Sequence, residues 1–172
     1  MSIFLIGYRG SGKTSVGKRL AQQLSNDFLD TDDLVVRRAG GRTIKQIFQD
    51  EGEAGFRELE SQAVRDVSRL DDHVISLGGG AVLRENNQRH LLAGGGKIFY
   101  LRCDATELLR RITGDAQSTE TRPALTHLGG GVEEIRTLLE RREPIYRRLM
   151  SAEVDVTHAS VEQVVSSILK LL

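Results

Sequence analysis

The stretch Gly7-Tyr8-Arg9-Gly10-Ser11-Gly12-Lys13-Thr14 constrains the fold of this chain more than any other. Its spacing, G-x-x-x-x-G-K-[ST], is typical of a loop that binds phosphate. An apolar run over Ile3–Ile6 precedes it, and Val16, Leu20 and Leu24 repeat at helical spacing after it. Glycines let the backbone curl so that several N–H groups converge on an anion, and the following helix adds its positive end. The sequence therefore predicts a strand, loop and helix that bind a nucleoside triphosphate.

Each polar position of the loop has an expected task. The Lys13 ammonium is suited to the β- and γ-phosphates, and the Thr14 hydroxyl to Mg²⁺. The residues expected to hold the phosphates are Gly10, Ser11, Gly12, Lys13, Thr14 and Ser15.

Composition excludes several other classes of protein. The 172 residues suit one domain, and equal numbers of Lys+Arg and Asp+Glu (24 each) give no basic field for nucleic acid or anionic membrane. No apolar run approaches the ~20 residues of a membrane span, and the N-terminus has no signal-peptide pattern. The lone Cys103 allows no internal disulfide. We expect a cytoplasmic, soluble protein that acts as a monomer.

Five short apolar runs alternate with helical patterns, which predicts an α/β fold: a five-stranded parallel sheet between two layers of helices. The expected strands lie near Ile3–Ile6, residues 28–29, 73–77, 97–101 and 154–156. One helix is expected over 34–39. Another should start at Ile44 after a Thr43/Gln46 capping box and break at Gly52. A third is expected over 132–150, with a kink at Pro144. Two further helices should begin after the capping pairs Asp104/Glu107 and Ser160/Gln163. Insertions over about 31–60 and 113–131 should flank the ligand crevice.

Carboxylates follow the second expected strand, as Asp30-Thr31-Asp32. Residues i and i+2 of a strand share a face, so both aspartates can look into the crevice. One can serve the metal, through water because Mg²⁺ keeps part of its hydration, and the other can accept the proton of an attacking hydroxyl. The alternative is a helix N-cap followed by a solvated first-turn charge.

Two further features are candidates for an acceptor site. Gly78-Gly79-Gly80 directly follows a buried strand and would leave room for a ligand against the backbone, the alternative being a loose turn. Arg57, Arg122 and Arg142 each suit a solvated surface, yet phosphoryl transfer and a small carboxylate substrate both require arginines.

In combination these pieces resemble the shikimate kinases, a branch of the nucleoside-monophosphate-kinase-like phosphate-loop proteins. The matching pieces are Gly7–Thr14, Asp30-Thr31-Asp32, Gly55-Phe56-Arg57, Gly78-Gly79-Gly80, Arg122-Pro123 and Arg142-x-Pro144-x-Tyr146, and they span nearly the whole chain. The resemblance implies ATP-dependent phosphorylation of the 3-hydroxyl of shikimate, with Mg²⁺, in aromatic amino-acid biosynthesis.

The resemblance also implies roles for single residues. Asp32 would hold the acceptor hydroxyl as base or orienter, and Arg57 and Arg142 would clamp the shikimate carboxylate beside Gly78, Gly79 and Gly80. Lys13 and Arg122 would stabilise the transferring phosphoryl group, Arg122 arriving as segment 113–131 closes as a lid. Thr14 would ligate Mg²⁺ with Asp30 assisting through water. Arg111 resembles the arginine that packs on adenine, although Arg110 is its neighbour.

One departure concerns the loop after the last strand, where the family often has a basic residue near adenine. Here the loop reads Thr157-His158-Ala159-Ser160, so we expect backbone atoms to serve instead. The alternatives that remain open are a gluconate-type sugar-acid kinase, a nucleotide kinase on the same fold, and a nucleotide-dependent switch without catalysis. A switch would have little need for Asp32, Arg57 and Arg122 together.

Overall fold

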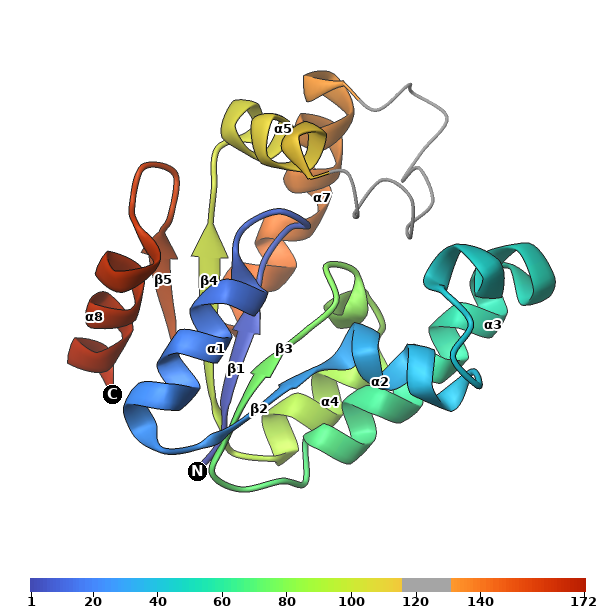
Figure 1. The fold of residues 1–172 in the computed structure, drawn as a ribbon, viewed down its shortest axis with the longest axis horizontal. Coiled ribbons are helices and arrows are strands. Elements are labelled where there is room, and N and C mark those ends of the chain that lie inside the picture. The colour runs from blue at the N-terminus through green and yellow to red at the C-terminus, as the bar shows by residue number, and fades with distance from the viewer. Residues whose placement is uncertain (116–130) are drawn as a thin grey trace.

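The computed structural model describes residues 1–115 and 131–172. In this part of the chain a parallel sheet has the strand order β2-β3-β1-β4-β5, with helices on both of its faces (Figure 1). The strands are β1 (Ile3–Ile6), β2 (Asp27–Asp30), β3 (His73–Ser76), β4 (Lys97–Arg102) and β5 (Ala152–Asp155). The helices are α1 (Lys13–Leu24), α2 (Thr31–Arg38), α3 (Ile44–Val67), the short 3-10 helix η1 (Ala81–Leu83), α4 (Glu85–Ala93), α5 (Ala105–Gly114), α7 (Val132–Leu149) and α8 (Val161–Leu171). The predicted three-layer α/β/α fold is confirmed.

The central strand β1 is apolar on both faces because each face meets a layer of helices. Ile3 and Leu5 belong to a core shared with α1, α5, α8 and the first half of α7. Phe4 and Ile6 face the opposite way, into a core shared with α3, α4 and the end of α7. The period of two along a strand separates these sets, and all four residues are at most 2% exposed.

A third, smaller core lies between α2 and α3, outside the sheet. Val35, Ile47 and Ala63 are fully buried in it. These helices project from the β2 edge of the sheet (Figure 1), and the expected insertion over about 31–60 falls on α2 and the first part of α3. This core fixes the helix that carries Arg57 and Glu60.

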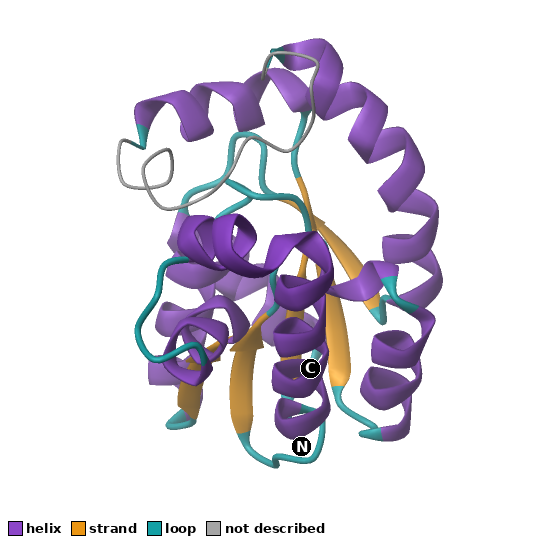
Figure 2. Ribbon diagram, turned by 90° about the vertical axis from the view of Figure 1, so that its right-hand side faces the viewer, coloured by secondary structure: helices purple, strands orange, loops and turns teal. Residues whose placement is uncertain are grey.

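Helix α7 passes from one side of the sheet to the other. Its Ile135 and Leu139 pack in the first core, and its Tyr146 and Leu149 pack in the second. The helix curves along the molecule as one continuous element with Pro144 inside it (Figure 2). This course brings Arg142 over the carboxyl ends of the strands.

Local signals predicted some helix starts correctly and others wrongly. The capping boxes of Thr43 with Gln46 and of Ser160 with Gln163 are both present, and Gly52 breaks the helical path of α3 with φ of 70°. Helix α5 begins after Asp104 as predicted, but the Asp104/Glu107 capping box is absent: Asp104 makes no side-chain cap bond, and its carboxylate accepts from Arg102 instead. Helix α2 was expected to begin at residue 34 but begins at Thr31, because Asp30 caps it directly at the end of β2.

No helix among the described residues combines the length and the apolar composition that crossing a bilayer would require.

Candidate active site

The phosphate loop joins β1 to α1 in the predicted arrangement. Gly10 and Gly12 have φ of 83° and 91°, a region that side-chain-bearing residues rarely adopt. The Lys13 ammonium donates to the carbonyl oxygens of Gly7 at 2.8 Å and Tyr8 at 2.9 Å. The Ser11 hydroxyl is buried without a hydrogen-bond partner among the described residues, which suits a loop built to hold an anion. Ser15 lies exposed in the first turn of α1.

Thr14 and Asp30 meet beside this loop. The Thr14 hydroxyl donates to Asp30 Oδ2 at 2.9 Å, and Asp30 Oδ1 accepts from the backbone N–H of Asp32 at 2.9 Å. Asp30 is therefore the N-cap of α2, which was the alternative interpretation of this acid, and it also lies beside the Thr14 hydroxyl. An exposed hydroxyl beside a carboxylate supplies the oxygen ligands that Mg²⁺ prefers.

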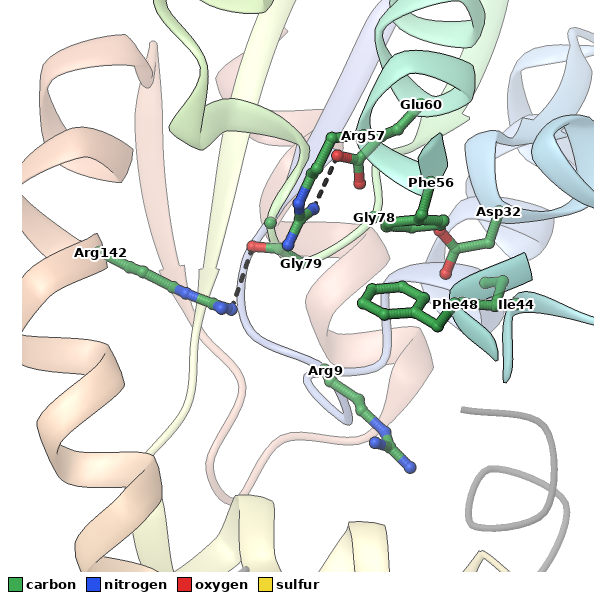
Figure 3. A pocket seen from close by; sticks show the side chains of 11 residues that line it. Arg9, Asp32, Ile44, Phe48, Phe56, Arg57, Glu60, Gly78, Gly79 and Arg142 are labelled. Carbon is green, nitrogen blue, oxygen red and sulfur yellow. Dashed lines mark hydrogen bonds and ion pairs between the residues drawn. The ribbon is translucent and has the colours of Figure 1, made fainter. Parts of the chain in front are cut away.

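The structure brings the expected acceptor residues together in one pocket. Asp32, Arg57, Gly78, Gly79, Gly80 and Arg142 line it, with Arg9, Ile44, Phe48, Phe56 and Glu60 (Figure 3). These residues follow the carboxyl ends of β1, β2 and β3 or come from α3 and α7. Because parallel strands share one carboxyl edge, residues far apart in the sequence meet here.

The three glycines allow side chains and the phosphate loop to approach closely. A Cβ atom on Gly78 would lie 2.7 Å from Asp32 Oδ1, and one on Gly80 would lie 2.7 Å from an Arg57 Nη. A Cβ on Gly79 would lie 3.3 Å from the backbone nitrogen of Arg9. The Gly78 N–H is bonded to the Thr31 hydroxyl at 2.9 Å. The glycines thus accommodate Asp32 and Arg57, in addition to the ligand space that the sequence suggested.

Arg57 is held by a buried acid that the sequence analysis missed. Its Nη1 donates to Glu60 Oε2 at 2.7 Å, while its Nε lies 3.6 Å from the exposed carboxylate of Glu53. Glu60 is only 1% exposed, and burial raises the pKa of its carboxyl while the charge of Arg57 opposes that rise. The i,i+3 spacing on one helix was the available signal, yet this spacing is equally common on solvated helix faces.

Arg142 is buried on the opposite side of the pocket. It is 7% exposed, its Nη1 makes a long hydrogen bond of 3.4 Å to the Gly79 carbonyl, and its Nε has no partner among the described residues. The Tyr146 hydroxyl donates to the same carbonyl at 2.8 Å. A buried guanidinium nitrogen without a partner among the described residues is suited to donate to a ligand oxygen.

Two other groups of lining residues were not predicted. Arg9 of the phosphate loop also lines the pocket, at a position the loop motif leaves variable, and its guanidinium points away from Arg57 and Arg142 (Figure 3). Phe48 and Phe56 form an apolar wall, with ring centroids 4.8 Å apart. Both were expected at the helical spacing typical of core residues, and Phe56 appeared in the Gly55-Phe56-Arg57 match without a role of its own.

Arg111 and Arg110, the two candidates for the arginine near adenine, have different surroundings. Arg111 donates to the carbonyls of Val156 at 2.7 Å and Thr157 at 3.4 Å, and its Nη1 lies 3.9 Å from where a Cβ on Gly12 would be. Arg110 has a 73% exposed side chain and pairs with Glu107. Arg111 therefore lies between the phosphate loop and the Thr157–Ser160 loop. Arg122 and most of the segment 113–131 lie outside the described residues.

The ion pair of Arg57 and Glu60 predicts a pH-dependent stability. A carboxyl whose folded pKa exceeds its unfolded value binds more protons when folded, so it lowers stability as pH rises between the two values. Arg57→Met removes the charge that opposes this rise, so the folded pKa rises further and the window widens. Urea unfolding measures the free energy of unfolding of the variant and of wild type at pH 4.5 and pH 7.5. We expect the variant's deficit in this free energy to be larger at pH 7.5, by about 1.4 kcal/mol for each unit by which the Glu60 pKa rises.

Two variants control this measurement. The double variant Arg57→Met with Glu60→Gln has no titrating group at position 60, so its deficit in the free energy of unfolding should be the same at both pH values. Arg38→Met breaks an exposed pair with Asp66, and its deficit should likewise not depend on pH. If Arg57→Met lowered the free energy of unfolding equally at both pH values, the charge of Arg57 would not be acting on Glu60, and the proposed effect of this ion pair would be contradicted.

Comparison with known proteins agrees with this geometry. The family model described as shikimate kinase matches residues 9–172. A shikimate kinase of Rhodopirellula baltica is 39% identical over 168 residues, covering 98% of this chain and 88% of that protein. A shikimate kinase of Caldanaerobacter subterraneus is 40% identical over 169 residues, covering 98% and 94%.

Solved structures give the same result. A shikimate kinase from Acinetobacter baumannii in complex with shikimate superposes with a TM-score of 0.90 at 32% identity, covering 99% of this chain and 91% of that one. A gluconokinase from Sinorhizobium meliloti reaches a TM-score of 0.65 at 18% identity, covering 99% and 90%, which is a likeness of fold alone. From the family match and the full-length identities, this chain belongs to the shikimate kinase family.

Proposed function

We propose that this chain transfers the γ-phosphoryl group of ATP to the 3-hydroxyl of shikimate. The observation that carries the proposal is the shared wall between the two sites. The position of a Gly79 Cβ is 3.3 Å from Arg9 N and 3.6 Å from Gly7 O, so the acceptor pocket borders the phosphate loop directly. A hydroxyl bound near Asp32 is thereby brought close to a phosphate held by the loop.

Shikimate is a cyclohexene ring with one carboxylate and three hydroxyls, and the pocket offers a group for each part. Arg57 and Arg142 supply two guanidinium groups for the carboxylate, and the carboxylate of Asp32 can accept hydrogen bonds from hydroxyls. Phe48 and Phe56 supply an apolar surface for the ring face. An open-chain sugar acid such as gluconate has no such face, which favours shikimate over the sugar-acid alternative.

The chemistry follows from positioning and charge. The oxygen of the 3-hydroxyl forms a bond to the γ-phosphorus, the bond from that phosphorus to the bridging oxygen of ADP breaks, and the hydroxyl proton passes to Asp32. We propose that Lys13 exchanges its two loop carbonyls for phosphate oxygens when ATP binds. The phosphate-loop N–H groups and the start of α1 stabilise the same charge.

The family uses ATP with a divalent metal, and we propose Mg²⁺ for this chain. The Thr14 hydroxyl would be a direct ligand, and Asp30, which already accepts from that hydroxyl, would bind through water. When bound, the ion neutralises charge on the β- and γ-phosphates. We propose further that Arg111 packs against adenine, with the Thr157–Ser160 loop contributing backbone atoms. We also propose that the chain works as a single kinase domain and as a monomer.

The acceptor is tested by ADP release in the presence of ATP and Mg²⁺, with shikimate, gluconate and a nucleoside monophosphate as parallel acceptors. We expect saturable turnover with shikimate alone, because only this acceptor matches both the carboxylate clamp and the apolar wall. Turnover with gluconate alone would contradict the proposal. Slow hydrolysis that ignores every acceptor would support a switch instead.

Asp32→Asn tests the proposed proton acceptor. The amide keeps the shape of the side chain but cannot accept the proton, so we expect kcat to fall by about a hundredfold or more while the KM for ATP stays near its wild-type value. The neighbouring Asp33→Asn is the matched control, because Asp33 is exposed, and it should leave kcat unchanged. A near-normal kcat for Asp32→Asn would remove this residue from the reaction.

A further inference from the structure

Tyr8, a variable residue of the phosphate loop, lies under the arginine of the acceptor pocket. Its side chain is packed in the core beside α7 and is 1% exposed. The guanidinium carbon of Arg142 lies 5.4 Å from the centre of its ring, within the range of a cation–π interaction. A residue of the nucleotide loop thus contacts the acceptor side of the site.

The backbone of Tyr8 has a separate task. Its carbonyl oxygen accepts from the Lys13 ammonium at 2.9 Å and from the Ser11 N–H at 3.2 Å. The nucleotide side of the site therefore uses the main chain of Tyr8, and the acceptor side uses its ring. A substitution of the side chain can affect one site and spare the other.

The ring face, and not the hydroxyl, is the part of Tyr8 that acts on Arg142. The hydroxyl is buried and has no hydrogen-bond partner among the described residues. Burial raises its pKa to about 12, although the charge of Arg142 opposes the rise, so the phenol is neutral near pH 7. A neutral ring presents its electron-rich face to the guanidinium.

The hydrogen bonds of the Arg142 guanidinium to other described residues fix its orientation only weakly. Its hydrogen bond to the Gly79 carbonyl is long, at 3.4 Å, and its Nε is buried without a partner in the described part of the chain. A guanidinium must be fixed in plane and rotation to meet a carboxylate with two parallel hydrogen bonds. The flat ring beneath it supplies that constraint.

We propose that Tyr8 is a positioning residue that holds the guanidinium of Arg142 for the acceptor carboxylate. The proposal rests on the proposed function, because it takes the carboxylate to be that of shikimate. It also predicts that the effect of Tyr8 depends on the carboxylate of the acceptor. Only a ligand with a free carboxylate benefits from the fixed guanidinium.

The test compares Tyr8→Leu with Tyr8→Phe, using shikimate and its uncharged methyl ester as acceptors. We expect Tyr8→Leu to raise the KM for shikimate about tenfold and to leave the KM for ATP within about twofold. Its kcat/KM for the methyl ester should change by less than about twofold. Tyr8→Phe keeps the ring and should match wild type with both acceptors.

Three results would overturn the role of Tyr8: equal losses for both acceptors in Tyr8→Leu, an equal rise in the KM for ATP, or a Tyr8→Phe variant as impaired as Tyr8→Leu. Absence of turnover with shikimate in the wild-type protein would contradict the proposed function instead. The two failures are therefore distinguishable.

Stability needs its own control, since Tyr8→Leu removes a buried ring. Phe28→Leu removes another ring that faces a cation, Lys18 at 5.9 Å, and should lower the melting temperature without changing either KM. If Tyr8→Leu does not fold, pentafluorophenylalanine at position 8 keeps the ring shape but withdraws electrons from its face. This replacement should raise the KM for shikimate relative to Tyr8→Phe, and equal values would overturn the proposal.

Discussion

The site depends on a close contact between two loops, with a glycine at the point of approach. The phosphate loop and the Gly78-Gly79-Gly80 segment approach so closely that a Cβ on Gly79 would lie 3.3 Å from Arg9 N and 3.6 Å from Gly7 O. On either side, Gly78 and Gly80 leave room for Asp32 and Arg57, each of which would be 2.7 Å from a Cβ. The nucleotide and acceptor sites therefore share a wall of backbone. Phosphoryl transfer requires this proximity, because the two reacting atoms must meet in line.

Charge in the pocket is arranged around this wall. Arg57 is paired with the buried Glu60, whereas Arg142 lies against a neutral ring and a carbonyl oxygen. The two arginines thus have different partners: one is fixed by an acid, and the other retains a buried nitrogen without a partner among the described residues. The residues that line the pocket include three arginines, Arg9, Arg57 and Arg142, and two acids, Asp32 and Glu60, so an incoming carboxylate meets an excess of positive charge. The arrangement suits a small anionic acceptor.

The sequence predicted the architecture well because its signals were local. The phosphate-loop spacing, the apolar strands and the capping boxes at Thr43 and Ser160 each depend on nearby residues alone. Helix α5 begins after Asp104 as predicted, but without the side-chain capping bond, because the Asp104 carboxylate accepts from Arg102. The pairing of Asp30 with Thr14, of Glu60 with Arg57 and of Tyr8 with Arg142 depends on packing or on rotamers that no spacing rule fixes. The strand order likewise follows from long-range pairing. The family resemblance supplied the residue roles, and the structure supplied the contacts that make them physically reasonable.

The most direct test of this account is a crystal structure of the protein with shikimate and a non-hydrolysable ATP analogue. The account predicts that the shikimate carboxylate contacts the guanidinium groups of both Arg57 and Arg142, with the 3-hydroxyl within hydrogen-bond distance of Asp32 and facing the γ-phosphate. The ring of Tyr8 should remain beneath Arg142. A carboxylate that faces the phosphate loop, or a 3-hydroxyl remote from Asp32, would contradict the account.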